Sequence, residues 1–411
     1  MNTAPEEVGF VRELRSRCAA EGRIFWINDK QLAVFDPDMA LHINAINFSD
    51  LTLPDKLADL VRGRTGKPIS WKSVRTAWIE QLRRLSDSEG VGRIAARVSA
   101  LIDEHLDRPV DLVWLAREIC TRAFFPLVLA DLPPADRARV LRDQTFKVDR
   151  LMIREAEAGP KTVWKTLRSY YIQASAGSAV RREIRGRARG RRPRQLDLTD
   201  PIVDMLPDLG IDRAVDAVTT ILTAIAGPPA ASTACLLYEL TRQTDWADRL
   251  SNELDSIPLN EMYTAPMRVA PTAARFVKES LRMWSPPLFM TRPVRTEINL
   301  EQACLNGTHH YLVSPYLTHH DPHHWTDPDT FDPDRWLQDA GQNSHGGSRY
   351  VPFGWSPTAC IGASVGTTLL MLLSHLMSTR YRIQLAEPES VRIVLDAVPL
   401  PVHFHGTITR R

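Results

Sequence analysis

The chain has 411 residues, of which 44% are hydrophobic and 24% are charged, and its formal net charge is +2. This balance is ordinary for a globular protein and gives no overall attraction to nucleic acid or to an anionic membrane. Five cysteines without paired spacing exclude a disulfide framework and indicate a reducing compartment. The first residues contain no apolar leader, so we expect a cytoplasmic protein without a membrane anchor.

Taken in chain order, residues 10–20 have a helical pattern, and the runs RIFWI and LAVFD then predict two strands around a turn at Asn28–Asp29. Helical periodicity dominates from about residue 38 to 379, most clearly at 74–85, 91–106, 112–130 and 163–174. Strand patterns return near 298–303, 309–317, 381–386, 391–395 and 401–408. The pattern predicts one mostly α domain, 1–411, with a β-containing N-terminal part over about 1–60 and a helical core over about 61–411.

The segment from Arg181 to Arg194 holds eight arginines, one glutamate and no aromatic residue. Nucleic-acid binding would need a wider basic surface and stacking partners. The pattern therefore favours a solvated helix end that runs into a loop and stops at Pro193.

The stretch PFGWSPTACIGASVG, residues 352–366, places Cys360 between a loop and an apolar helical run. A thiolate near a helix N-terminus is stabilised by the helix dipole and by unpaired N–H groups, which favours metal ligation. Gly362 would allow close approach of a ligand, because glycine has no Cβ. A free cysteine is also often a small buried apolar residue, so this stretch alone leaves both interpretations open.

Two further motifs precede Cys360. KESLRMW places Glu279 and Arg282 three residues apart on a helix, and FDPDRW, Phe331–Trp336, offers Arg335 as a second cation for the same carboxylate. E-x-x-R, F-x-P-x-R-W and the cysteine loop, in this order, resemble the cytochrome P-450 family of heme-thiolate monooxygenases. The resemblance covers roughly residue 214 to the C-terminus and implies that family's triangular-prism fold, mostly α with small β-sheets.

The resemblance also implies site roles. Cys360 would be the axial ligand of a heme b iron, with Phe353 packed beside it and Ile361 and Gly362 completing the loop. The other implied roles are a buried ion network (Glu279, Arg282, Arg335), partners of the heme propionates (Arg292, Arg83, Trp78) and a substrate-pocket lining (Pro287, Leu288, Phe289). The spacing from Trp78 to Arg83 is one residue longer than the family's common W-x-x-x-R.

The family's long central helix corresponds to Ala214–Leu240, about 40 Å of helix. Its signature, A-G-x-[DE]-T, supplies an acid and an alcohol for proton delivery. Here the candidate catalytic residues are Ala226, Gly227, Pro229 and Ala230, with Pro229 at the acid position and Ala230 at the alcohol position. Neither can relay a proton, and the adjacent prolines predict a kink. A merely kinked core helix, or replacement of the alcohol by Ser232 or Thr233, remains an alternative.

The cysteine loop departs from F-x-x-G-x-[RH]-x-C-x-G at Ser356 and at Thr358, where a cation would contact a propionate. A rival zinc site is suggested by His319-x-x-x-His323, with Cys304 upstream. That segment, however, has the pattern of a strand and a proline-containing turn, where this spacing does not place both rings on one face.

The resemblance therefore implies a heme-thiolate oxidoreductase that hydroxylates or otherwise oxidises an apolar small molecule in natural-product biosynthesis. Its implied partners are a ferredoxin and a ferredoxin reductase, and we expect a monomer with Arg83, Arg84 and Lys72 as docking cations. Three routes stay open for the missing acid–alcohol pair: substrate- or water-assisted oxygen activation, a peroxide or nitrogen-oxide oxidant, and a non-redox rearrangement or dehydration. A heme-binding or sensor protein without turnover is a further alternative.

Overall fold

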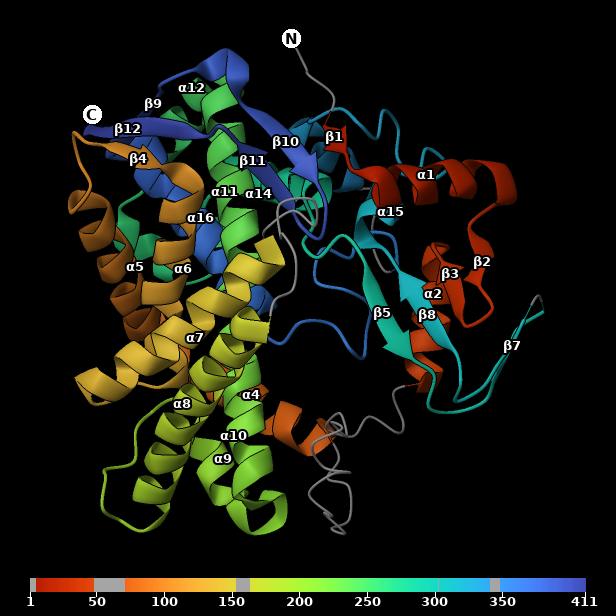
Figure 1. The fold of residues 1–411 in the computed structure, drawn as a ribbon. Helices are drawn as coiled ribbons and strands as arrows, with labels where there is room; N and C mark the ends of the chain where they lie inside the picture. Colours follow the sequence, from red (N-terminus) through yellow and green to blue (C-terminus); the bar gives the residue numbers. More distant parts are fainter. Residues whose placement is uncertain (1–4, 48–70, 153–162, 302, 341–347) are drawn as a thin grey trace. The chain divides into compact units, whose positions relative to one another are not determined.

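The computed structural model describes residues 5–47, 71–152, 163–301, 303–340 and 348–411 (Figure 1). Its internal contacts gather in two compact units. Unit 1 comprises Met1–Ser49, Asp87–Cys120 and Pro228–Arg411, and unit 2 comprises Asp50–Ser86 and Thr121–Gly227. The expected mostly α fold with small sheets is confirmed, whereas the single-domain organisation stays a prediction.

Unit 1 begins with the elements that the sequence predicts. Helix α1 (Gly9–Glu21) precedes strands β2 (Ile24–Asn28) and β3 (Gln31–Val34) and helix α2 (Pro37–Asn47). Strand β3 pairs in parallel with β8 (His310–Val313), and β8 pairs antiparallel with β5 (Met290–Pro293), so the sheet order is β2-β3-β8-β5. This sheet fixes the strand that carries Arg292, which pairs with Tyr311.

Three smaller sheets complete the strands of unit 1. They are β1 (Glu6–Glu7), β10 (Arg392–Leu395) and β11 (Pro399–Val402); β4 (Pro109–Asp111), β12 (His405–Arg410) and β9 (Tyr381–Leu385); and β6 (Ile298–Asn299) with β7 (Cys304–Leu305). Unit 1 also contains the short helices η2 (Leu259–Tyr263), α13 (Pro266–Val269), η3 (Pro333–Ala340) and η4 (Pro388–Ser390).

The longer helices of unit 1 are α5 (Ser88–Asp103), α12 (Thr244–Leu254), α14 (Pro271–Met283) and α16 (Ala363–Thr379). Helix α14 is amphipathic, and its buried face packs against α16, which is itself buried over most of its length. The burial of α16 accounts for its run of leucines and methionines. The E-x-x-R motif therefore lies on a helix in contact with the helix that follows Cys360.

Unit 2 is helical. It contains α4 (Trp71–Leu85), α7 (Pro134–Met152), α8 (Val163–Ala188), α9 (Asp200–Asp204) and α10 (Leu206–Ala224), and α6 (Leu112–Val128) enters it from unit 1. Helix α8 packs against both α7 and α10 (Figure 1). Five of the eight arginines between Arg181 and Arg194, at the end of α8 and just after it, bind carboxylates, and Arg187 is buried against Asp197 and Glu183. This pairing supports the interpretation of the basic run as an ordinary helix end.

The prediction of one continuous central helix over Ala214–Leu240 is wrong. Helix α10 ends at Ala224, and α11 (Gly227–Arg242) begins after an interruption at Ile225 and Ala226. The Ala226 N–H bonds to the Thr223 carbonyl, three residues back, at 3.3 Å. Because Pro228 and Pro229 have no N–H groups, the regular ladder cannot continue, and the expected kink is confirmed as a break.

By length and composition alone, the stretch Leu206–Arg242 could cross a membrane. Its most apolar window is 67% buried within the protein, as in the core helix of a globular domain.

Candidate functional site

The carboxylate of Glu279 is the centre of a buried ion network in unit 1. It accepts five hydrogen bonds: from Arg282 Nη2 (2.8 Å) and Nε (3.0 Å), Arg335 Nε (3.0 Å), the Asp332 N–H (3.0 Å) and Trp336 Nε1 (3.1 Å). Glu279 and Arg282 are fully buried. The pair is therefore no surface contact, and the structure brings together all three residues that the sequence assigns to this network.

The two arginines bind the loop that precedes F-x-P-x-R-W. Arg282 donates to the carbonyls of His319 (2.8 Å), Pro328 (2.7 Å) and Thr330 (3.0 Å). Arg335 donates to Thr326 (2.8 Å) and also to Thr330 (3.1 Å). The network thus fixes this loop against α14.

Cys360 lies three residues before the first residue of α16, in a loop of defined conformation. The Cys360 N–H donates to the Phe353 carbonyl at 2.8 Å, and Gly354 has φ +80°, which a residue with a Cβ rarely adopts. A Cβ on Gly354 would lie 3.4 Å from Met290 Cε of β5. The thiol side chain is exposed at the N-terminal end of the helix, in the environment that favours a thiolate.

Ser356 and Thr358 are the two residues at which the cysteine loop departs from the family pattern. The Thr358 hydroxyl donates to the Trp355 carbonyl at 3.2 Å, so it stabilises the loop where the pattern has a cation. Ser356 is exposed. Trp355 is buried, and its Nε1 donates to the Ser348 carbonyl at 3.0 Å. Both of these hydrogen bonds lie within residues 348–360.

Arg292, on β5, has no carboxylate partner in the part of the chain that the structure describes. Its Nε is buried and has no hydrogen-bond partner among the described residues, and its Nη2 lies 3.9 Å from Met290 Sδ. Burial lowers the pKa of the guanidinium, and Arg295 adds to this effect. A buried arginine in this state favours an anionic ligand.

Two expected propionate partners lie in unit 2. Trp78 is buried, and its Nε1 donates to the Leu198 carbonyl at 2.8 Å, so its N–H is used within the unit. Arg83 is exposed on the last turn of α4. The heme roles of both residues stay predictions.

The residues expected around a substrate are largely apolar and buried. Ala226 and Ala230 are 1% and 0% exposed, Gly227 is buried and Pro229 is half-buried. Leu288 is buried, Pro287 is half-buried, and the Phe289 ring contacts Phe10 and Phe35. Ser232 is half-buried, and the Thr233 hydroxyl lies 3.4 Å from the Cys120 thiol.

The family model described as Cytochrome P450 matches residues 164–401, more than half of the chain. The chain belongs to the cytochrome P450 family. Among curated relatives, it is 31% identical over 182 residues to the cytochrome P450 monooxygenase alnD of Emericella nidulans, and 36% identical over 110 residues to cyclooctatin synthase of Streptomyces melanosporofaciens. These matches cover 43% and 27% of this chain and 32% and 24% of the relatives' own length.

Solved cytochrome P450 structures share the fold over almost the whole chain. The retinoic acid-bound cyanobacterial CYP120A1 gives a TM-score of 0.75 at 15% identity, covering 97% of this chain and 94% of that one. A zebrafish cytochrome P450 with progesterone gives 0.76 at 16% identity, covering 98% and 100%. At these identities the likeness shows the fold alone.

The cytochrome P450 family implies a heme-iron cofactor, and the residues of unit 1 fit it. The exposed Cys360 thiol at the start of α16 supplies the soft ligand that heme-thiolate proteins use. The buried Arg292 Nε supplies a donor for a propionate.

One residue that sequence reasoning assigned to a rival site belongs to this framework. The expected strand is confirmed at His310–Val313, but His319 ends the short helix α15 (Pro315–His319) where a turn was expected. Both of its ring nitrogens are engaged: Nδ1 with the Arg282 carbonyl (3.1 Å) and Ser285 Oγ (2.9 Å), and Nε2 with the Val351 N–H (2.8 Å). His323 is exposed and binds Asp321. Within the described residues, no group of three metal-ligating side chains forms.

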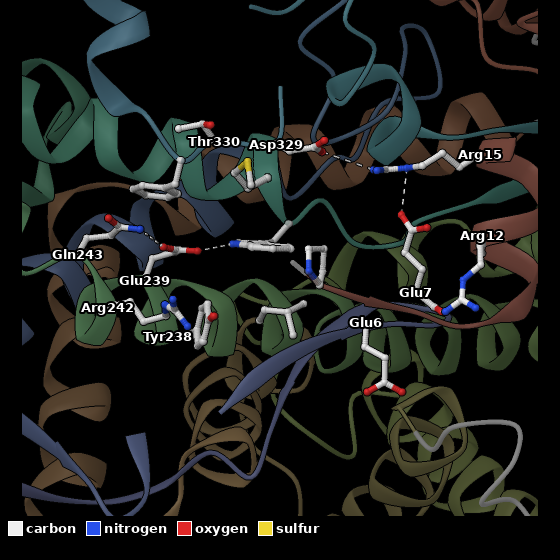
Figure 2. Close-up of a pocket in the computed structure, with 15 residues that line it drawn as sticks. Glu6, Glu7, Arg12, Arg15, Tyr238, Glu239, Arg242, Gln243, Asp329 and Thr330 are labelled. Carbon is white, nitrogen blue, oxygen red and sulfur yellow. Dashed lines mark hydrogen bonds and ion pairs between the residues drawn. The ribbon is translucent and has the colours of Figure 1, made fainter. Parts of the chain in front are cut away.

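Unit 1 also contains a separate cavity of about 550 Å³ (Figure 2). Its walls come from the N-terminal residues, the end of α11, the end of α14 and the loop before F-x-P-x-R-W, and include Glu7, Arg15, Tyr238, Glu239, Arg242, Trp284 and Asp329. The buried Glu239 accepts from Trp284 Nε1 and Gln243 Nε2, each at 2.8 Å. Burial raises the pKa of Glu239 to about 7, against these two hydrogen bonds and the charge of Arg242.

Proposed function

We propose that this cytochrome P450 is a heme-thiolate oxidoreductase that oxidises an apolar small molecule, by hydroxylation or a related reaction, in the biosynthesis of a natural product. The observation that carries the proposal is the loop in which Cys360 precedes α16, with its N–H bonded to the Phe353 carbonyl. The relative named cyclooctatin synthase is consistent with a role in making a specialised compound.

In this proposal heme b supplies the oxidative chemistry, and the chain supplies ligation, orientation and exclusion of water. Cys360 would ligate the iron, and Arg292 would donate to a propionate from its unsatisfied Nε–H. Ala226, Gly227 and Ala230 are small and apolar, which would suit an apolar substrate. Leu288 and Pro287 add apolar surface after α14.

The test is the spectrum of the reduced, CO-bound protein. We expect wild-type protein to show the red-shifted Soret band of thiolate ligation and Cys360→Ser to lose it. Cys304→Ser is the matched control, because Cys304 is the other exposed cysteine among the described residues. A colourless wild-type protein, or an unchanged band in Cys360→Ser, would overturn the proposal.

The proton source is the second part of the proposal. Pro229 and Ala230 carry no proton-relaying group, and the Thr233 hydroxyl faces Cys120. We infer that a substrate hydroxyl, or water ordered beside Ala230, supplies the proton when dioxygen is the oxidant. The lack of a hydroxyl at Pro229 and Ala230 also suits an oxidant that needs no proton delivery from the protein. Peroxide-driven turnover is therefore the second candidate function.

Turnover with ferredoxin and reductase, compared with turnover driven by hydrogen peroxide, separates these routes. Substrates come from a panel of apolar metabolites, selected by the spectral shift that binding produces. Turnover with peroxide alone would favour the second candidate. Product isomeric with the substrate, formed without reductant or peroxide, would identify a non-redox enzyme, and binding without any turnover would identify a heme-binding protein.

The proposed electron donors are a ferredoxin and its reductase, acting on a monomer in the cytoplasm. Arg83, Arg84 and Lys72 on α4 are the proposed docking cations. Arg84 is exposed and bound to Glu80 at 2.6 Å, a contact that an acidic partner can replace. If Arg84→Glu leaves the salt dependence of reduction unchanged, this docking surface is wrong.

A further inference from the structure

His319 lies between the ion network and the cysteine loop, and contacts both. Its side chain is 0% exposed, and its ring stacks on Tyr350, with centroids 5.6 Å apart and planes 28° apart. Tyr350 is the residue before Val351, whose N–H points at His319 Nε2. On the other side, Arg282 donates to the His319 carbonyl at 2.8 Å.

The hydrogen bonds assign the tautomer of the ring. A backbone N–H can only donate, so Nε2 accepts from Val351 and carries no proton. Nδ1 therefore carries the proton and donates to the Arg282 carbonyl, with Ser285 Oγ also within 2.9 Å. The Ser285 hydroxyl itself donates to the Leu281 carbonyl, so its oxygen is available as an acceptor. Burial and the charge of Arg282 lower the pKa of His319 to about 3, so the neutral ring is the working form.

This arrangement makes His319 a bridge with two different ends. On one side, His319 Nδ1 donates to the Arg282 carbonyl, and the His319 carbonyl accepts from the Arg282 guanidinium. Glu279 in turn binds Arg282. The other end binds the backbone two residues before Phe353, whose carbonyl accepts the N–H of Cys360. The bridge therefore joins the E-x-x-R motif to the loop that carries the thiol.

We propose that His319 is a positioning residue for Cys360: its Nε2 acceptor holds the start of the cysteine loop at Val351 and so keeps the thiol in the orientation for iron ligation. The inference deepens the proposed heme-thiolate function and rests on it. It assigns a role to the histidine that the sequence grouped with a zinc site.

Two substitutions, each of which replaces only one of the two ring nitrogens of His319, test its proposed role. In His319→Gln, the side-chain oxygen can occupy the place of Nε2 and accept from Val351. In His319→Asn, the shorter amide can reach only the place of Nδ1, so the Val351 N–H loses its acceptor. The matched control is His320→Asn, because His320 is also buried and bonds to the Tyr316 carbonyl at 2.9 Å.

The first readout is hydrogen exchange of the peptide that contains residues 350–360, measured by mass spectrometry on the holoprotein. An unsatisfied buried N–H should speed exchange at Val351 by about tenfold or more in His319→Asn. His319→Gln and His320→Asn should match wild-type protein at this peptide. Equal exchange in all three variants would overturn the proposal.

The second readout is the fraction of reduced, CO-bound protein with the thiolate Soret band, together with the thermal unfolding midpoint. We expect His319→Asn to lose thiolate fraction severalfold more than His320→Asn at a similar loss of midpoint. His319→Gln should recover most of it. If the thiolate fraction follows the midpoint in every variant, His319 is merely structural and the inference fails.

The two experiments separate this inference from the proposed function. Wild-type protein without a thiolate band would refute the heme-thiolate function, and with it the role of His319 toward Cys360. A normal band in wild-type and His319→Asn protein alike would refute the inference alone.

Discussion

Glu239 gives the protein a pH-dependent stability that one substitution should remove. Its carboxyl is 3% exposed at the end of α11, in the cavity of Figure 2. Trp284 and Gln243 donate to it, Arg242 also favours its charge, and Glu279 disfavours it. Burial outweighs the favourable contacts and raises its pKa from the ordinary 4.5 to about 7.

The sign follows from proton uptake. Between pH 4.5 and 7 the folded protein holds a proton at Glu239 that the unfolded chain has released. The stability contribution is therefore fully present below pH 4.5, falls as the pH rises, and levels off above pH 7. A shift of about 2.5 pKa units corresponds to about 3 kcal/mol at 1.36 kcal/mol per unit.

Glu239→Gln cannot ionise, and it keeps an oxygen for Trp284 Nε1. Relative to wild-type protein, the variant should gain about 3 kcal/mol of unfolding free energy between pH 4.5 and pH 8. Urea unfolding followed by circular dichroism across this range measures the difference. The exposed Glu261→Gln serves as control and should show a flat difference. A flat difference for Glu239→Gln as well would refute the reasoning.

Three further predictions concern the site. Glu279→Ala leaves Arg282 and Arg335 without their carboxylate and should lower the unfolding free energy by about 3–5 kcal/mol in thermal unfolding. Replacing the exposed Glu80 by Ala should cost less than about 1 kcal/mol. Comparable losses in the two variants would contradict the buried network. Arg292→Leu removes the half-buried cation whose Nε has no partner, so we expect faster heme transfer to apomyoglobin without loss of apoprotein stability. Heme retention equal to that of wild type would argue against the propionate contact. Ala230→Thr restores an alcohol and should raise the amount of product formed per NADPH consumed in the ferredoxin-driven reaction, while peroxide-driven turnover stays unchanged. If the product formed per NADPH does not change, substrate-assisted proton delivery is disfavoured.

Much of the fold could be predicted because its signals are local. The helix at α1 and the strands around Asn28–Asp29 follow from periodicity and turn residues. The pairing of β3 with β8 could not, because it joins segments almost 280 residues apart and depends on tertiary packing. Helix α15 was missed for a related reason: it has only five residues, begins at Pro315 and follows a strand directly.

The site divides in the same way. Helical spacing pairs Glu279 with Arg282, the resemblance makes them a buried network with Arg335, and the structure adds the donors Trp336 Nε1 and Asp332 N–H. The tryptophan of F-x-P-x-R-W was the available signal, since a buried indole needs an acceptor. The role of His319 had no such signal, because its partner is a backbone N–H, which every non-proline residue carries.

The energetics of the Glu279 network indicate why a chain without the acid–alcohol pair would still carry it. Removing two or three charges from water costs several kcal/mol each, and apolar replacements of such networks are often neutral or stabilising. Stability alone therefore does not account for five donors on one buried carboxylate. Apolar packing could not reproduce the directed hydrogen bonds to the backbone: the Asp332 N–H donates to Glu279, and Arg282 and Arg335 donate to carbonyls of the preceding loop. Arg282 binds His319, and His319 accepts a hydrogen bond from Val351 at the start of the Cys360 loop. The part of the site that this chain retains is therefore the part that orients the thiol.

A triple variant with Glu279, Arg282 and Arg335 replaced by Gln, Met and Met tests this reasoning. It should stay folded while the thiolate Soret band weakens, and a full-strength band in a folded triple variant would show that orientation does not depend on the network.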